Sequence, residues 1–110
     1  MFPMIKHKFN AKPCEADGKK FPSKLERSYY NQLKLRQANG EVLFFLQQTP
    51  FQLVGGVKYV VDFTVFLSDG TVEFIDCKGV MTPMSILKIK QVEEIYPIKI
   101  KIVGNKGDKQ

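Results

Sequence analysis

The stretch VKYVVDFTVFLSDGTVEFIDCK, residues 57–78, contains the pattern that decides the fold of this chain. Alternating β-forming residues lie on both sides of a Ser-Asp-Gly turn signal, which is typical of two antiparallel strands joined by a tight loop. Asp62 interrupts the first strand, and Asp76 and Lys78 share one face of the second because they are two residues apart. Strict alternation assigns the odd-numbered residues of the first strand to the face opposite Asp62: Val57, Tyr59, Val61, Phe63, Val65 and Leu67.

The length of the turn determines which residue lies opposite Asp62, since a shift of register by one residue reverses every face. A two-residue loop would place Asp62 opposite Cys77. A three-residue loop needs a left-handed residue at its last position, which Gly70 provides, and it places Asp62 opposite Asp76. We favour the three-residue loop, which brings Asp62, Asp76 and Lys78 into one patch.

Two carboxylates directly opposite each other on adjacent strands repel, and a divalent cation would resolve the conflict. Mg²⁺, or Mn²⁺ in its place, is typically held by one or two carboxylates, several waters and substrate phosphates. Lys78 could then orient or deprotonate an attacking water and stabilise charge on a phosphate. In the simpler alternative, Asp62 and Asp76 are edge-strand charges that discourage aggregation, and Lys78 forms an ordinary salt bridge.

The elements around this hairpin predict a mixed-sheet α/β domain with flanking helices, in the order helix, three strands, helix, strand. A Ser-x-x-Glu capping box opens the first helix, and a Thr-Pro pair opens the second. A Gly-Gly pair favours a two-residue hairpin loop, and the last connection is expected to be a right-handed parallel crossover. The predicted ranges are a helix over 23–39, strands over 42–46 and 51–54, the strand pair over 57–78, a helix over 82–96 and a strand over 98–102.

We divide the chain into a basic, irregular N-terminal arm over 1–22, a core over 23–103 and a polar tail over 104–110. Glu26, on the first helix, could add a metal ligand if that helix covers the carboxylate face. The capping box alone also explains Glu26, and the two roles compete for one carboxylate. Cys77 faces away from Asp76 into the core, although its backbone carbonyl could help to ligate the metal.

The formal charge of +6 is unevenly distributed. Residues 1–36 carry +6, residues 37–77 carry −4 and residues 78–110 carry +4, so basic flanks surround an acidic centre. Basic flanks fit a polyanion such as DNA, and an acidic centre fits a cation. The natural phosphate contacts are Lys6, Lys8, Lys12, Arg27, Lys88 and Lys90, of which Lys88 and Lys90 could equally form the solvated face of a helix.

Other classes of protein are disfavoured by the composition. Two cysteines without a CxxC motif, and the single histidine His7, cannot form a usual zinc site or disulfide framework, so we expect a reducing, cytoplasmic setting. Apolar runs such as 42–46 are too short to span a bilayer, so we expect no membrane partner.

The spacing of these residues resembles a known signature. Asp62, followed after 13 residues by Asp76-Cys77-Lys78, is similar to the PD-(D/E)XK motif of restriction-endonuclease-like nucleases, and Glu26 resembles the extra acidic ligand common there. Val61 stands where the motif's name has proline, and Asp76 where many members have Glu. The chain resembles more closely a family of small phage and prophage proteins in that superfamily. The residues that carry this resemblance are His7-Lys8-Phe9-Asn10-Ala11-Lys12, Asp17-Gly18, Phe21-x-Ser23-Lys24-x-Glu26, Leu46-Gln47, Val61-Asp62-Phe63 and Asp76-x-Lys78-Gly79.

The resemblance implies a restriction-endonuclease-like fold and a Mg²⁺- or Mn²⁺-dependent endodeoxyribonuclease, with Glu26, Asp62, Asp76 and Lys78 as its catalytic residues. The expected role is phage DNA processing or recombination on branched, Holliday-junction-like, or duplex DNA, in the host cytoplasm. Because so small a domain covers little DNA, we expect a symmetric homodimer. The alternative is a non-catalytic DNA-binding module on a nuclease-like fold.

Overall fold

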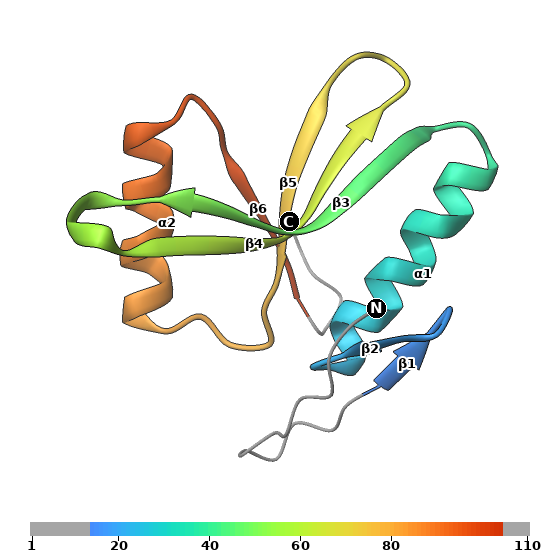
Figure 1. Ribbon diagram of the computed structural model, residues 1–110, viewed down its shortest axis with the longest axis horizontal. Helices are drawn as coiled ribbons and strands as arrows, with labels where there is room; N and C mark the ends of the chain where they lie inside the picture. The colour runs from blue at the N-terminus through green and yellow to red at the C-terminus, as the bar shows by residue number, and fades with distance from the viewer. Residues whose placement is uncertain (1–13, 105–110) are drawn as a thin grey trace.

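The computed structural model describes residues 14–104 and is an α/β structure with one mixed four-stranded sheet and two long helices (Figure 1). The strands lie in the order β3-β4-β5-β6, with antiparallel pairing except between β5 and β6, which are parallel. The elements are β1 (Cys14–Ala16), β2 (Lys19–Phe21), α1 (Lys24–Ala38), β3 (Val42–Gln52), the short 3-10 turn η1 (Val54–Gly56), β4 (Lys58–Leu67), β5 (Val72–Cys77), α2 (Pro83–Ile95) and β6 (Ile100–Val103).

Both long helices begin where their capping residues predict. The Ser23 hydroxyl accepts a hydrogen bond from the main-chain N–H of Glu26 at 3.1 Å, and α1 starts at Lys24, directly after Ser23. The Thr82 hydroxyl accepts from the Ser85 N–H at 3.1 Å, with Pro83 at the first helical position of α2. The predicted starts of the two helices are therefore confirmed, as is the parallel pairing of β5 with β6.

The first long strand differs from the prediction. The two strands expected over 42–46 and 51–54 are one strand, β3, which continues through Pro50. Proline is tolerated there because β3 is at the edge of the sheet. The expected two-residue Gly-Gly loop is also wrong, since the 3-10 turn Val54–Gly56 contains three residues and is closed by the Leu53 N–H donating to the Val57 carbonyl at 2.7 Å.

The segment expected to be an irregular arm contains a hairpin over 14–21, formed by β1 and β2 around a turn at Asp17. Phe21 is only 1% exposed and packs on the Tyr30 ring, with the ring centroids 5.0 Å apart. Strands of three residues are too short to give an alternation signal, which is why the pattern of the sequence missed them.

Two hydrophobic clusters lie on opposite faces of the sheet, one packed on α1 and one packed on α2, since the neighbouring β5 residues Phe74 and Ile75 pack with different clusters. Figure 1 shows the two helices apart, on either side of the sheet. The α1 cluster contains Phe21, Tyr29, Tyr30, Leu33, Val42, Phe63, Val65 and Ile75. The α2 cluster contains Leu53, Tyr59, Val61, Val92 and Ile100.

Strand β4 contributes to both clusters. Tyr59 and Val61 pack with α2, whereas Phe63 and Val65 pack with α1, so the prediction of one common face for these residues is wrong. Between the two pairs lies Asp62, and Figure 1 shows β3 and β4 changing direction near their middles. No helix within residues 14–104 is both long and apolar enough to cross a membrane.

Candidate active site

The register of β4 and β5 places the two predicted acidic ligands opposite each other. Phe63 pairs with Ile75 at the end of the ladder, and one further step in the same register places Asp62 opposite Asp76. At the other end of the hairpin the Leu67 N–H donates to the Thr71 carbonyl at 2.9 Å, which closes a three-residue loop. The last residue of that loop is Gly70, with a φ of 93°. The predicted three-residue turn is confirmed, and the register that follows from it is the one that sets Asp62 opposite Asp76.

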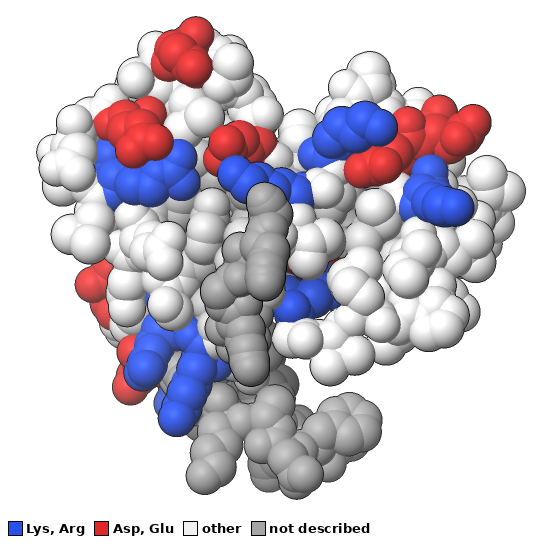
Figure 2. All heavy atoms as spheres, turned by 180° about the vertical axis from the view of Figure 1, so that it is seen from behind, with Lys and Arg blue, Asp and Glu red and all other residues white. Residues whose placement is uncertain are grey.

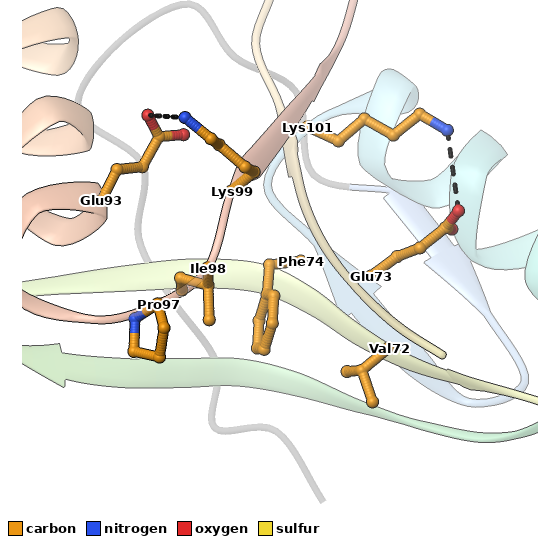
Figure 3. Close-up of a pocket in the computed structure, with 8 residues that line it drawn as sticks. All are labelled: Val72, Glu73, Phe74, Glu93, Pro97, Ile98, Lys99 and Lys101. Carbon is orange, nitrogen blue, oxygen red and sulfur yellow. Dashed lines mark ion pairs between the residues drawn. The ribbon is translucent and has the colours of Figure 1, made fainter. Parts of the chain in front are cut away.

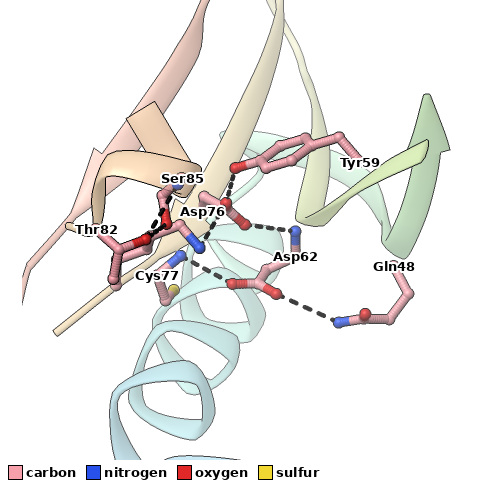
Figure 4. A network of polar contacts seen from close by, with 8 residues as sticks. Gln48, Tyr59, Asp62, Asp76, Cys77, Thr82 and Ser85 are labelled. Atoms are coloured by element: carbon pink, nitrogen blue, oxygen red, sulfur yellow. Dashed lines mark hydrogen bonds and ion pairs between the residues drawn. The ribbon is translucent and has the colours of Figure 1, made fainter. Parts of the chain in front are cut away.

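Each of these carboxylates accepts a hydrogen bond from the main chain of the facing strand (Figure 4). The Asp62 N–H donates to Asp76 Oδ1 at 3.1 Å, and the Cys77 N–H donates to Asp62 Oδ2 at 2.9 Å. The Cys77 side chain packs against the α1 cluster, as predicted. The two acidic side chains thus stand in for strand-to-strand hydrogen bonds at the point where the sheet turns.

Asp76 is 2% exposed, and two side chains satisfy its second oxygen. The Tyr59 hydroxyl donates to Asp76 Oδ2, and Lys78 Nζ lies 3.4 Å from the same oxygen. Burial, and then the hydrogen bond to Asp76, hold the pKa of the Tyr59 phenol above its usual range. The salt bridge expected of Lys78 in the simpler alternative is therefore present, and it lies within the predicted catalytic patch.

Tyr59 is a site residue that the sequence did not predict. Strict alternation placed it on the face opposite Asp62, whereas the bend of β4 directs it toward Asp76. The available signal was its phenol, because a buried tyrosine hydroxyl usually finds a hydrogen-bond partner.

Helix α1 brings a third carboxylate to the patch. Glu26 is 5% exposed, and its Oε2 accepts from Gln48 Nε2 at 3.2 Å. The same Gln48 nitrogen lies 3.4 Å from Asp62 Oδ1, so one amide bridges α1 and β4. Capping and site roles do not compete at Glu26, because the cap uses its main-chain N–H and leaves its carboxylate directed toward the sheet.

Gln48 is the second site residue that the sequence did not predict. It follows the motif Leu46-Gln47 but carries no pattern of its own, since a single glutamine in a strand is uninformative. Only the pairing of β3 with β4 brings it to the carboxylates, because the pairs on either side of Gln48 place it level with Asp62.

The electrostatics of the patch reflect crowded negative charge. Burial, and then the charges of Asp62 and Asp76, raise the pKa of Glu26 to about 8. Burial, and then Asp76, raise the pKa of Asp62 to about 6. A bound cation would relieve both effects, because an opposite charge nearby favours ionised carboxylates.

The donor atoms suit a hard cation, since every candidate side-chain ligand is a carboxylate oxygen. Within the described part of the chain, no three His, Cys, Asp or Glu side chains form a ready-made ligand cluster. Mg²⁺ often takes only one or two protein carboxylates and completes its shell with water and phosphate oxygens. Asp62 with Asp76 or Glu26 therefore fits such an ion.

The predicted DNA contacts are only partly described. Lys6, Lys8 and Lys12 lie outside the described residues. Arg27 is half-buried next to Glu26 on α1, whereas on α2 Lys88 is half-buried and Lys90 is exposed. Figure 2 shows basic and acidic side chains interspersed on the face that it presents, rather than one continuous basic strip.

A separate open pocket of about 710 Å³ lies where β5, β6 and the end of α2 meet (Figure 3). Its charged groups are already paired, with Lys99 Nζ 3.9 Å from Glu93 and Lys101 Nζ 3.8 Å from Glu73. None of the four predicted catalytic residues lines this pocket, so it is distinct from the carboxylate patch.

The chain matches a known protein family. A family model described as "Protein of unknown function (DUF1064)" matches residues 6–105. No curated protein and no solved structure matches the chain.

Proposed function

The chain belongs to the DUF1064 family, whose description assigns no function, and we propose from the site itself that it is a metal-dependent endodeoxyribonuclease. The observation that carries this proposal is the opposition of Asp62 and Asp76 across β4 and β5, with Lys78 paired to Asp76. Two acidic residues that face each other across a hairpin, one of them buried, destabilise the strand pair by charge repulsion, and ion-assisted phosphodiester hydrolysis is a chemistry that uses such a pair with a lysine beside it.

In this proposal the chain's own groups have distinct roles. Asp62, Asp76 and Glu26 hold Mg²⁺ or Mn²⁺, and the Cys77 carbonyl is a further candidate ligand. When bound, the cation supplies positive charge for the phosphate oxygens and makes water a stronger nucleophile. Lys78 orients or deprotonates the attacking water and stabilises negative charge that develops on the phosphate. Tyr59 donates to Asp76 Oδ2 and so fixes the orientation of that carboxylate.

The similarity to PD-(D/E)XK nucleases supports the same proposal. The element order helix, three strands, helix, strand is compatible with their core, and β5 and β6 carry the expected parallel crossover. We therefore propose branched or duplex DNA as the substrate and a symmetric homodimer as the working form. Phosphate contacts would come from Arg27, Lys88 and Lys90, together with the lysines of the N-terminal segment.

One observation favours a second candidate, a DNA-binding module without catalysis. Asp76 and Asp62 already accept hydrogen bonds from protein groups, so the folded protein satisfies them in the absence of a cation. A binding module would need these residues only to join β4 to β5. It would have no reason to take up divalent ions.

The decisive experiment incubates the purified protein with junction, flap, duplex and single-stranded DNA in Mg²⁺, in Mn²⁺ and in a chelator. We expect cleavage of branched or duplex DNA only with the metals. Asp76→Asn removes a charge at constant shape and should abolish cleavage, whereas Glu94→Gln, at an exposed position on α2, should leave it unchanged. DNA binding without cleavage or metal uptake would establish the second candidate.

A further inference from the structure

Gln48 has a backbone conformation that is unusual for a residue inside a strand. Its φ of 57° lies in the left-handed region, which residues other than glycine adopt at a cost. Asp17, with a φ of 50°, is in a tight turn where such angles are usual. Gln48 lies in the middle of β3, where an extended backbone would be expected.

The strain has a local consequence for the side chain. The paired residues Gln47–Phe63 and Thr49–Val61 flank Gln48 and Asp62, and the Gln48 amide nitrogen is 3.2 Å from Glu26 Oε2 and 3.4 Å from Asp62 Oδ1. These two carboxylates belong to different layers, one on α1 and one on the sheet. The left-handed turn of the backbone places one amide between them. Strained residues of this kind persist where the surrounding structure enforces them, often at functional sites.

We propose that Gln48 is a positioning residue, whose strained backbone and bridging amide hold Glu26 near Asp62 so that one divalent cation can be bound by both layers. The inference rests on the proposed function and specifies how its metal site is assembled. An amide suits this role because it donates to both carboxylates without adding charge. A lysine at this position would cancel the negative charge that attracts the cation, and a glutamate would add to the repulsion.

Gln48→Gly separates the left-handed backbone of this residue from its bridging amide. Glycine adopts positive φ freely but has no amide side chain. We expect the Mn²⁺ affinity, measured by calorimetry at mildly alkaline pH, to fall by about tenfold or more, as when other supporting residues of a metal site are removed. The melting temperature of the metal-free protein should not fall. Gln48→Asn tolerates the same backbone but has a shorter side chain, so its affinity should lie between those of the wild type and the glycine variant.

The matched control is Asp17→Gly, which also places glycine at a left-handed position but removes a side chain that accepts from the Tyr30 hydroxyl and makes no hydrogen bond to the carboxylate patch. Its Mn²⁺ affinity should equal that of the wild type. The proposal is overturned if Gln48→Gly binds Mn²⁺ as the wild type does, or if its affinity and melting temperature fall together, which would indicate a merely structural role. Failure of the nuclease proposal has a different signature, because the wild type would then cleave no DNA whatever the glycine variant does to Mn²⁺ affinity.

Discussion

The main-chain N–H of Asp62 donates to the carboxylate of Asp76 at 3.1 Å, so the two predicted metal ligands are bonded to each other across the strand pair. The same Asp76 carboxylate accepts from Tyr59 and pairs with Lys78. The same two oxygens of Asp76 therefore join the strands and would bind a cation. A useful substitution at Asp76 keeps the shape of the side chain and removes only its charge.

Asp76→Asn should keep the fold but abolish cleavage, and Asp76→Ala should also unfold more easily. The alanine variant leaves the Tyr59 hydroxyl and the Asp62 N–H without their buried acceptor, which costs about 1–3 kcal/mol for each group. The asparagine variant keeps one acceptor oxygen and should lose less. Urea denaturation and DNA cleavage, measured on both variants, check this. Equal stability of the two variants would show that the carboxylate does not join the strands.

The turn and capping residues in the sequence were enough to predict the hairpin register and the starts of the helices. The bend of the sheet could not be predicted in this way, because it depends on contacts between strands. Gly70 fixes the turn because few residues other than glycine accept its φ of 93°, and the parity of the strands then places Asp62 opposite Asp76. Strict alternation, however, assumes a straight strand. The left-handed Gln48 lies in a partner strand, so no pattern within β4 indicates that Tyr59 turns toward Asp76.

The stability of the metal-free protein should fall as pH rises toward 8. The pKa of Glu26 is raised in the folded state to about 8, from an unfolded value of about 4.3. The folded state therefore binds the additional proton between these values, and this contribution to stability is lost as pH rises through 8.

Glu26→Gln removes this dependence, because glutamine cannot ionise. Its advantage over the wild type should grow to on the order of a few kcal/mol between about pH 5 and pH 8. Urea denaturation in a chelator measures the difference at both pH values. The control is Glu94→Gln, since Glu94 is exposed on α2 and its replacement should give no such trend. A constant difference between Glu26→Gln and the wild type would contradict the raised pKa.

Metal binding should show the opposite dependence on pH. Cations bind carboxylates only in the ionised form, so protons must leave Asp62, with a pKa of about 6, and Glu26, with a pKa of about 8. Mn²⁺ affinity should therefore rise across this range, by up to about tenfold per pH unit for each proton released. Calorimetry in buffers of different ionisation enthalpy counts those protons. In Glu26→Gln only the rise near pH 6 should remain, and an affinity independent of pH would exclude both carboxylates as ligands.

Substitution of Lys78 tests whether this lysine acts in catalysis or only forms a salt bridge with Asp76. Its ammonium lies 3.4 Å from the buried carboxylate of Asp76 and is itself partly exposed, so the geometry alone fits either role. If its role is that pair alone, Lys78→Gln should change cleavage less than about fivefold. If Lys78 acts on the attacking water and the phosphate, the substitution should lower kcat by about 100-fold or more while Mn²⁺ and DNA affinities change little. Single-turnover cleavage with preformed protein–DNA complex measures that step directly, and Lys90→Gln on α2 serves as the control, since it should weaken DNA binding without lowering the single-turnover rate.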